Sequence, residues 1–176
     1  MRAFVALEMP AQLADEAAAV ARVLSSRIEG RFIPRENYHL TLAFLGDIEE
    51  AQVRDAMAVL DEIGRQVGPV ALMPSGLGKF GRAHDATFWM GFAPTDSLMS
   101  LCVFVRDQLA ARNVPFESNV FKPHLTLARR AHIPQGPLPD APFPAPSEGH
   151  TVTLFKSNLA RTGATYKPLY SVELSD

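Results

Sequence analysis

Apolar residues recur along the chain with two periods, and each period predicts a different kind of element. Three segments place an apolar residue at every third or fourth position, which is the period of an amphipathic helix. The first begins near Pro10, and Gly30 is expected to end it. Its apolar stripe consists of Leu13, Ala17, Val20, Leu24 and Ile28.

Two further helices are predicted downstream. Residues 47–50 have the form of a capping box, and Gly68 ends the segment that they open. Either Thr95 or Asp96 can cap the third helix, and Asn113 is a suitable terminator. The second helix has its apolar face at Val53, Met57, Leu60, Ile63 and Val67. The third has its apolar face at Leu98, Leu101, Cys102, Val105 and Leu109.

Short apolar or alternating runs between these helices predict β-strands, and together they favour an α+β fold in layers. The predicted strands span residues 4–7, 40–45, 70–72, 87–92, 125–128, 152–155 and 166–174. Residues 132–150 contain six prolines and predict a long surface loop. The glycine-rich residues 76–82 lack the spacing of a phosphate-binding loop and predict a turn.

An internal repeat is the most informative feature of the sequence. Residues 38–44 and 123–129 share the run His-Leu-Thr-Leu-Ala, 85 positions apart. The chain holds five histidines, so chance is a poor explanation and duplication a better one. We therefore expect one bilobal domain over residues 1–176, with two pseudo-twofold-related lobes whose antiparallel sheets face a central cleft and whose helices lie outside.

Alternate residues of a strand share a face. His39 and Thr41 therefore point one way, while Leu40, Leu42 and Phe44 are expected to point into a core. The second copy repeats this pattern, so two imidazoles and two hydroxyls can line one cleft.

Such a cleft suits the hydrolysis of a phosphodiester. One imidazole can take a proton from water while the other protonates the departing oxygen, and an ordinary pKa near 6.5 lets them divide these roles near neutral pH. The hydroxyls of Thr41 and Thr126 can donate hydrogen bonds to the non-bridging phosphate oxygens. His39 and His124 are thus the predicted catalytic pair, and the scheme requires no metal or other cofactor.

These motifs resemble those of the 2H phosphoesterase superfamily, and within it the LigT-like RNA 2′,3′-cyclic phosphodiesterases, also called 2′-5′ RNA ligases. The likeness covers nearly the whole chain and is carried by residues 2–7, 37–46, 121–129 and 163–166. It implies a bilobal α+β fold and opening of RNA 2′,3′-cyclic phosphate ends to 2′-phosphomonoesters, with reversible 2′-5′ ligation as a further reaction.

The resemblance also implies roles for particular residues. His39 is assigned as the acid on the 3′ oxygen and His124 as the base on water, although pseudo-symmetry lets these roles exchange. Thr41 and Thr126 are implied to bind phosphate oxygens. Arg129 matches a family position that can neutralise the phosphate, but its odd offset from His124 places it on the opposite face unless the strand carries a bulge. The first repeat has Phe44 at the equivalent position.

Composition narrows the setting of this chemistry. The chain has 176 residues, is 47% hydrophobic and carries a net charge of −2, which argues against a non-specific nucleic-acid coat. Its C-terminal third is nevertheless cationic. We expect a cytoplasmic monomer without a membrane span or signal peptide, whose one cysteine, Cys102, packs in the core. The expected partner is RNA with a 2′,3′-cyclic phosphate end, or a cyclic nucleotide.

A second hypothesis is a non-catalytic module that binds RNA ends or nucleotides in the same cleft. The other histidines, His84, His132 and His150, lack a matching Thr and are expected at the surface. Trp89 is expected to pack in the core rather than to stack on a base. Asp47 is accounted for by helix capping, which disfavours a two-metal centre.

Overall fold

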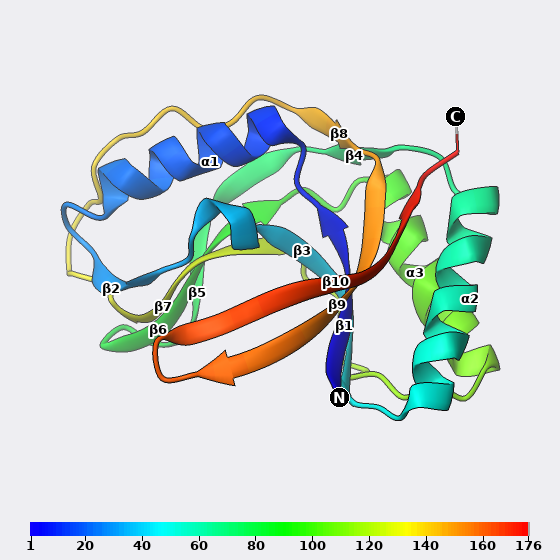
Figure 1. The fold of residues 1–176 in the computed structure, drawn as a ribbon. Helices are drawn as coiled ribbons and strands as arrows, with labels where there is room; N and C mark the ends of the chain where they lie inside the picture. Colours follow the sequence, from blue (N-terminus) through cyan, green and yellow to red (C-terminus); the bar gives the residue numbers. More distant parts are fainter. Residues whose placement is uncertain (176) are drawn as a thin grey trace.

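The computed structural model describes residues 1–175, and its strands alternate with three long helices (Figure 1). In chain order the elements are β1 (Arg2–Glu8), α1 (Ala11–Leu24), β2 (Glu29–Phe32), the 3-10 helix η1 (Arg35–Asn37), β3 (His39–Asp47), α2 (Glu50–Gln66), β4 (Val70–Leu72), β5 (Pro74–Arg82), β6 (Asp85–Phe92), α3 (Asp96–Ala111), β7 (His124–His132), β8 (Ser147–Gly149), β9 (Thr151–Ala160) and β10 (Gly163–Glu173).

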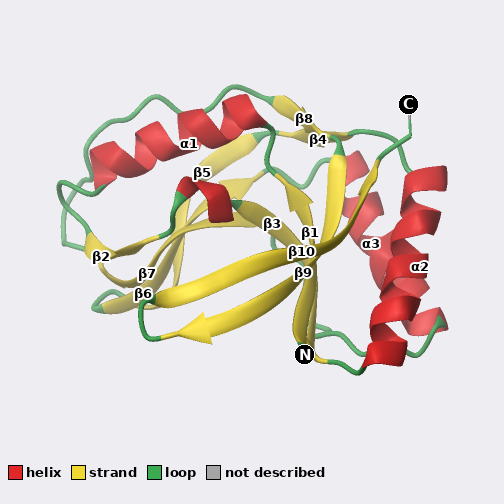
Figure 2. Ribbon diagram, in the orientation of Figure 1, coloured by secondary structure: helices red, strands yellow, loops and turns green. Residues whose placement is uncertain are grey.

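The strands form two four-stranded sheets and one short ribbon, all of them antiparallel (Figure 2). One sheet has the order β10-β9-β1-β3, and the other has the order β2-β7-β6-β5. The ribbon pairs β4 with β8. The two copies of the repeat therefore lie in different sheets, as β3 and β7, which confirms the predicted α+β fold with two lobes.

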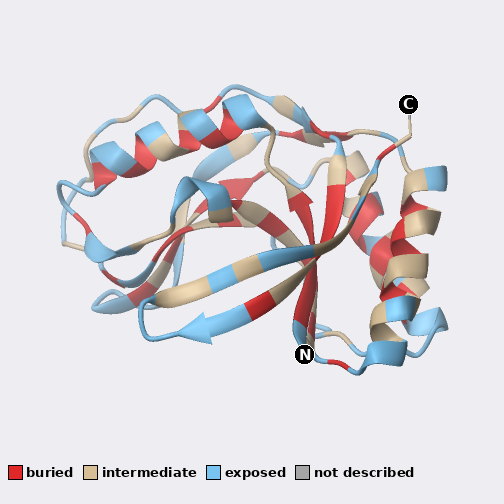
Figure 3. Cartoon of the chain, viewed as in Figure 1, coloured by how far each residue is buried: buried red, intermediate tan, exposed pale blue. Residues whose placement is uncertain are grey.

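The helices lie on the outside and turn their apolar faces inward. Helices α2 and α3 lie side by side against the sheet that contains β3, while α1 lies over the other sheet (Figure 1). The burial pattern follows this arrangement, with buried residues on the inner side of each helix (Figure 3). Cys102 is buried in this core, as predicted. No helix within residues 1–175 has the length and apolar content needed to cross a membrane.

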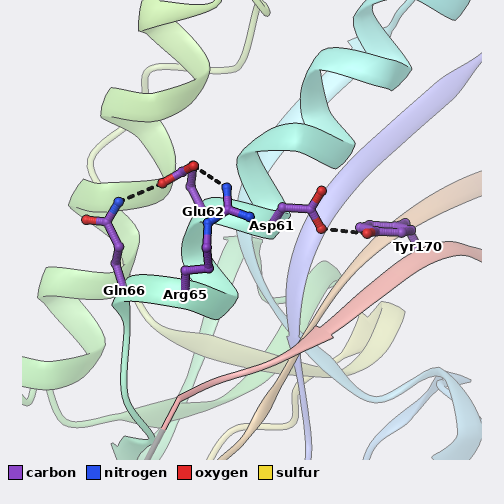
Figure 4. Close-up of polar contacts among 5 residues, drawn as sticks. All are labelled: Asp61, Glu62, Arg65, Gln66 and Tyr170. Atoms are coloured by element: carbon purple, nitrogen blue, oxygen red, sulfur yellow. Dashed lines mark hydrogen bonds and ion pairs between the residues drawn. The ribbon is translucent and has the colours of Figure 1, made fainter.

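A side-chain hydrogen bond links α2 to the last strand. The Tyr170 hydroxyl on β10 donates a hydrogen bond of 2.5 Å to the carboxylate of Asp61 (Figure 4). On the outer face of the same helix, Glu62 accepts hydrogen bonds from Arg65 and Gln66. The helix therefore contributes a packed inner face and a polar outer one.

The helix stripes are confirmed except at their last residues, because Ile28 lies beyond the end of α1 and Val67 follows α2, and two predicted boundaries are wrong. Helix α1 ends at Leu24, before Gly30, which lies in β2. A Cβ at Gly30 would come within 2.9 Å of the Ala131 backbone on β7, so the glycine serves close strand pairing rather than a helix end. Asp47 ends β3 instead of capping α2. The Glu49 residue precedes α2, and its amide donates to Gln52 at 2.8 Å.

The third helix has the predicted ends. Thr95 is the residue that caps it, because its hydroxyl accepts the amide of Leu98 at 3.4 Å. Asn113 follows the helix with a φ of +59°, a conformation that asparagine tolerates better than most residues. The alternative cap, Asp96, is the first helical residue.

The glycine-rich and proline-rich segments differ from their predictions in part. Residues 76–82 form most of strand β5 rather than a turn, since β6 supplies their hydrogen-bonding partner. The proline-rich segment is mainly loop, but β7 continues to His132 and residues 147–149 form β8. This short strand lies in the two-stranded ribbon, so the prolines still keep the segment out of the main sheets.

Candidate active site

The two copies of the repeat meet at one pocket between the sheets. This pocket has a volume of about 80 Å³ and is lined by residues from η1, β3, β7 and β10. All five residues predicted for the site line it: His39, Thr41, His124, Thr126 and Arg129. The strand alternation thus brings the two imidazoles and two hydroxyls together as expected.

Each of these strands carries a β-bulge immediately after its His-x-Thr motif. Ala6 of β1 pairs with Thr41 of β3, and Val5 of β1 pairs with Ala43. Between these two pairs β3 therefore has one extra residue. On β7 the same shift occurs, because β6 pairs first with Thr126 and then with Ala128. In both strands the two residues after the threonine are buried.

The bulges return the next residue to the cleft side. Arg129 therefore lines the pocket beside His124 and Thr126, despite its odd offset in sequence. Phe44 reaches the cleft in the same way and lines an adjoining groove. The prediction that Phe44 points into the core is wrong, because it assumed a regular strand.

Main-chain carbonyls fix the orientation of both imidazoles. The Nδ1 atom of His39 lies 2.7 Å from the carbonyl oxygen of Asn37. The Nδ1 atom of His124 lies 2.6 Å from the carbonyl oxygen of Lys122. A carbonyl can only accept a hydrogen bond, so Nδ1 carries the hydrogen in both rings. Nε2 is then the nitrogen that is free to exchange a proton.

His39 lies in an aromatic environment that disfavours its charged form. Its ring centroid is 4.8 Å from that of Phe4, 5.1 Å from that of Tyr166 and 6.0 Å from that of Phe155. Burial lowers the pKa of His39 to about 4. The hydrogen bond with Asn37 raises this pKa, whereas the positive charge of Arg129 lowers it further. The free imidazole is therefore neutral at physiological pH.

His124 has a smaller aromatic neighbourhood on the other sheet. Its ring contacts those of Phe80 and Trp89, at centroid distances of 5.0 Å and 6.1 Å. Burial lowers its pKa as well, assisted by the charges of Arg129 and Lys122. Both imidazoles are thus biased toward the neutral state in the unliganded chain.

Trp89 does not lie in the core, contrary to the prediction from its apolar run. It pairs with Thr126 across β6 and β7, and directly opposed residues share a face, so it lies on the cleft side. The indole covers Gly78 on β5, where a Cβ would overlap the ring. Glycine at that position lets the indole lie flat on the sheet.

The sequence motifs did not identify every residue of the pocket. Asn37, Tyr166 and Ile33 also line it. The Asn37 side chain donates a hydrogen bond of 3.3 Å to the carbonyl oxygen of Ala164, which links the segment before β3 to β10. Tyr166 belongs to the closing block of the family resemblance, but no spacing argument pointed to it.

The remaining candidates lie away from this pocket. His84, His132 and His150 are exposed, as predicted. Within residues 1–175, no three side chains of His, Cys, Asp or Glu are grouped so that they could hold a metal ion. Asp47 is near the chain terminus, 3.9 Å from the α-ammonium group.

Comparisons with known proteins agree with this description. Residues 7–87 match the family described as LigT like Phosphoesterase. An RNA 2′,3′-cyclic phosphodiesterase of Thermotoga maritima is 31% identical over 98% of this chain and 95% of its own length. One from Escherichia coli is 32% identical over 96% and 93% of the two chains.

A solved structure shows the same fold. The crystal structure of E. coli LigT complexed with 3′-AMP superposes with a TM-score of 0.80 and 27% sequence identity, over 99% of this chain and 98% of that one. Another structure of E. coli LigT, complexed with phosphate, gives a TM-score of 0.76 at 28% identity over the same shares.

Fold and duplicated motifs together define a 2H phosphoesterase. The match to the Thermotoga maritima protein, which extends over nearly the full length of both chains, narrows this class to one family. This chain belongs to the RNA 2′,3′-cyclic phosphodiesterase family and is an enzyme of that class.

Proposed function

We propose that the enzyme hydrolyses RNA 2′,3′-cyclic phosphate ends to 2′-phosphomonoesters by a paired-histidine mechanism. The observation that carries this proposal is the shared pocket of His39 and His124, whose Nδ1 atoms are both held by carbonyls. Two imidazoles with free Nε2 atoms around one phosphate-sized space suit attack on one side of phosphorus and departure on the other.

The proposed step breaks one P–O bond and forms another. His124 takes a proton from water on Nε2 as the water oxygen bonds to phosphorus. The bond from phosphorus to the 3′ oxygen breaks, and His39 donates the Nε2 proton that this oxygen needs. The 2′ ester bond stays intact, which leaves a 2′-phosphate and a 3′-hydroxyl.

The other polar residues of the pocket support the reacting phosphate. Thr41 and Thr126 donate hydrogen bonds to its non-bridging oxygens, and the Arg129 guanidinium offsets their charge. The phosphate in turn raises the pKa of the nearby imidazoles, since its negative charge counters Arg129. Substrate binding therefore supplies the protonated histidine that the unliganded pocket disfavours.

The same geometry accommodates strand joining. A 5′-hydroxyl of a second RNA in place of water would attack the same phosphorus and give a 2′-5′ linkage. At the low concentration of free RNA ends in dilute solution, water wins by mass action, so hydrolysis is the main reaction.

Product analysis tests this proposal directly. An oligonucleotide with a 2′,3′-cyclic phosphate end is incubated with the enzyme in EDTA, and the products are compared with 2′- and 3′-phosphate standards. We expect a 2′-phosphate from the native chain and no turnover from His39→Ala or His124→Ala. His132→Ala is the matched control, because this exposed histidine ends the same strand as His124.

Two results would count against the proposal. A 3′-phosphate product would reverse the assignment of the leaving oxygen. Binding of the oligonucleotide without turnover, by a folded native chain, would favour the alternative of a non-catalytic module that binds RNA ends.

A further inference from the structure

A second cavity adjoins the catalytic pocket and is much larger. We call this cavity the arginine groove, because Arg2, Arg31 and Arg129 line it. It is formed by residues of β1, β2, β3, β7, β9 and β10 and has a volume of about 580 Å³. It shares His39, Thr41 and Arg129 with the smaller pocket. A ligand whose phosphate occupies the pocket can therefore extend directly into the groove, whose size is typical of nucleotide-sized ligands.

The charge of the arginine groove is of one sign. Arg2, Arg31 and Arg129 line it, and none of its lining residues is acidic. The ion pairs found within residues 1–175 involve none of these three arginines. The groove is thus a cationic surface whose charges are not neutralised by carboxylates of the chain.

Two of these arginines are direct neighbours. Arg31 on β2 pairs with Arg129 on β7, and like charges placed opposite each other destabilise a sheet. Arg31 also lies beside the β9–β10 hairpin, since its Cδ is 3.7 Å from where a Cβ on Gly163 would lie. A bound anion in the groove would relieve this repulsion.

The third arginine is held on the opposite lobe. The Arg2 guanidinium lies over the ring of Phe44, 4.7 Å from its centroid. Phe44 is the counterpart of Arg129 in the first repeat and reaches the cleft through the corresponding bulge of β3. The stacking fixes a guanidinium where the first repeat has no charge of its own.

We propose that the arginine groove binds the RNA strand upstream of the terminal nucleotide, with Arg2 and Arg31 contacting its internal phosphodiesters. This inference rests on the proposed function and adds a binding site to it, from which a preference for an oligonucleotide end over a cyclic mononucleotide follows. An RNA strand supplies the repeated anions that a row of unpaired arginines can bind, and a mononucleotide has one phosphate only.

A comparison of two substrates separates an effect on binding in the groove from an effect on the chemical step. The values of kcat/KM are measured for a 2′,3′-cyclic mononucleotide and for a tetranucleotide with a 2′,3′-cyclic phosphate end. Arg2→Gln and Arg31→Gln should lower kcat/KM on the tetranucleotide by about tenfold each, and on the mononucleotide by less than twofold. Both side chains are exposed, so the folded state should be retained. Arg54→Gln, an exposed arginine on α2, is the matched control.

The salt dependence of kcat/KM on the tetranucleotide is a second test of the same phosphate contacts. Each lost phosphate contact should reduce the slope of log kcat/KM against log salt by about 0.7 for a single strand. Equal losses on the two substrates, or no loss on the tetranucleotide, would overturn the inference.

A binding assay keeps this test independent of turnover. Fluorescence anisotropy with a 5′-labelled tetranucleotide should show weaker binding by Arg2→Gln and Arg31→Gln than by Arg54→Gln. If the native chain hydrolyses neither substrate, the proposed function fails while this comparison still decides the groove. Equal affinity of all three variants would refute the groove assignment.

Discussion

The protonation of His39 provides a test of the site that does not depend on catalysis. In the folded chain burial lowers the pKa of this imidazole from 6.5 to about 4. The unfolded chain exposes the ring, so its pKa there is the ordinary value near 6.5. Between these two pH values the unfolded state binds a proton that the folded state rejects. Acid therefore favours unfolding through this residue.

The size of the effect follows from the two pKa values. Each pH unit between them is worth about 1.36 kcal/mol, so His39 lowers the free energy of unfolding by about 3 kcal/mol as the pH falls from 7 to 4. The stabilising contribution is complete above pH 6.5 and is lost on the way down to pH 4. Carboxylates add their own acid dependence, so a variant is needed to isolate this one.

The His39→Gln variant removes the ionisable ring and keeps a polar side chain. Urea unfolding of both proteins at pH 7, 6, 5 and 4, in buffers without phosphate, gives the two free energies at each pH. We expect the native chain to lose about 3 kcal/mol more than the variant over this range. His150→Gln, which alters an exposed histidine, should behave like the native chain.

Parallel stability curves for the native chain and His39→Gln would refute this reasoning. They would mean that His39 titrates near its ordinary pKa and that the ring is more hydrated than its aromatic neighbours imply. An NMR titration of the imidazole protons would then place its pKa near 6.5 directly.

Three further predictions follow from the same site. Because the pKa values of both histidines lie below 6.5 in the free enzyme, kcat/KM should fall as the pH rises from 6.5 to 8, since the small protonated fraction of the acid decreases further with each pH unit; a flat profile between pH 5 and 9 would contradict the acid–base pairing. Thr41→Val and Thr126→Val should each lower kcat about a hundredfold with unchanged thermal unfolding, and a loss confined to KM would argue against a role in the transition state. Gly78→Ala places a methyl group against the indole of Trp89, so it should reduce the free energy of unfolding by about 1–3 kcal/mol and shift the emission of this single tryptophan; unchanged fluorescence would count against the packing.

Much of the fold can be predicted from the local periodicity of apolar residues. The stripes of the three helices and most of the strands were predicted correctly, because burial of one face imposes a repeat on the sequence. Strand β5 was missed, since its glycines lower β-propensity and only the pairing with β6 makes it a strand. Gly30 was misread as a helix end for a related reason: its partner is Ala131, which is remote in sequence.

In the candidate site, too, some positions follow from local sequence and others depend on strand pairing. His39 and His124 could be found from the repeat and their shared pocket from strand alternation. The positions of Phe44 and Arg129 depend on a bulge, which is a property of two paired strands and has no signature in one of them. Trp89 was assigned to the core because its neighbours are apolar, although its own side chain faces Thr126.

The divergence between Phe44 and Arg129 has a consequence for how a substrate is read. A cyclic phosphate is nearly symmetric about its phosphorus, and a perfectly duplicated site would accept it in either of two orientations, releasing either ribose oxygen. One lobe instead places the Arg129 guanidinium in the catalytic pocket beside its histidine, whereas the other has the Phe44 ring, which carries the Arg2 guanidinium in the adjoining groove. We therefore expect this unequal pair of side chains to favour one orientation of the cyclic phosphate, and with it the release of one ribose oxygen over the other.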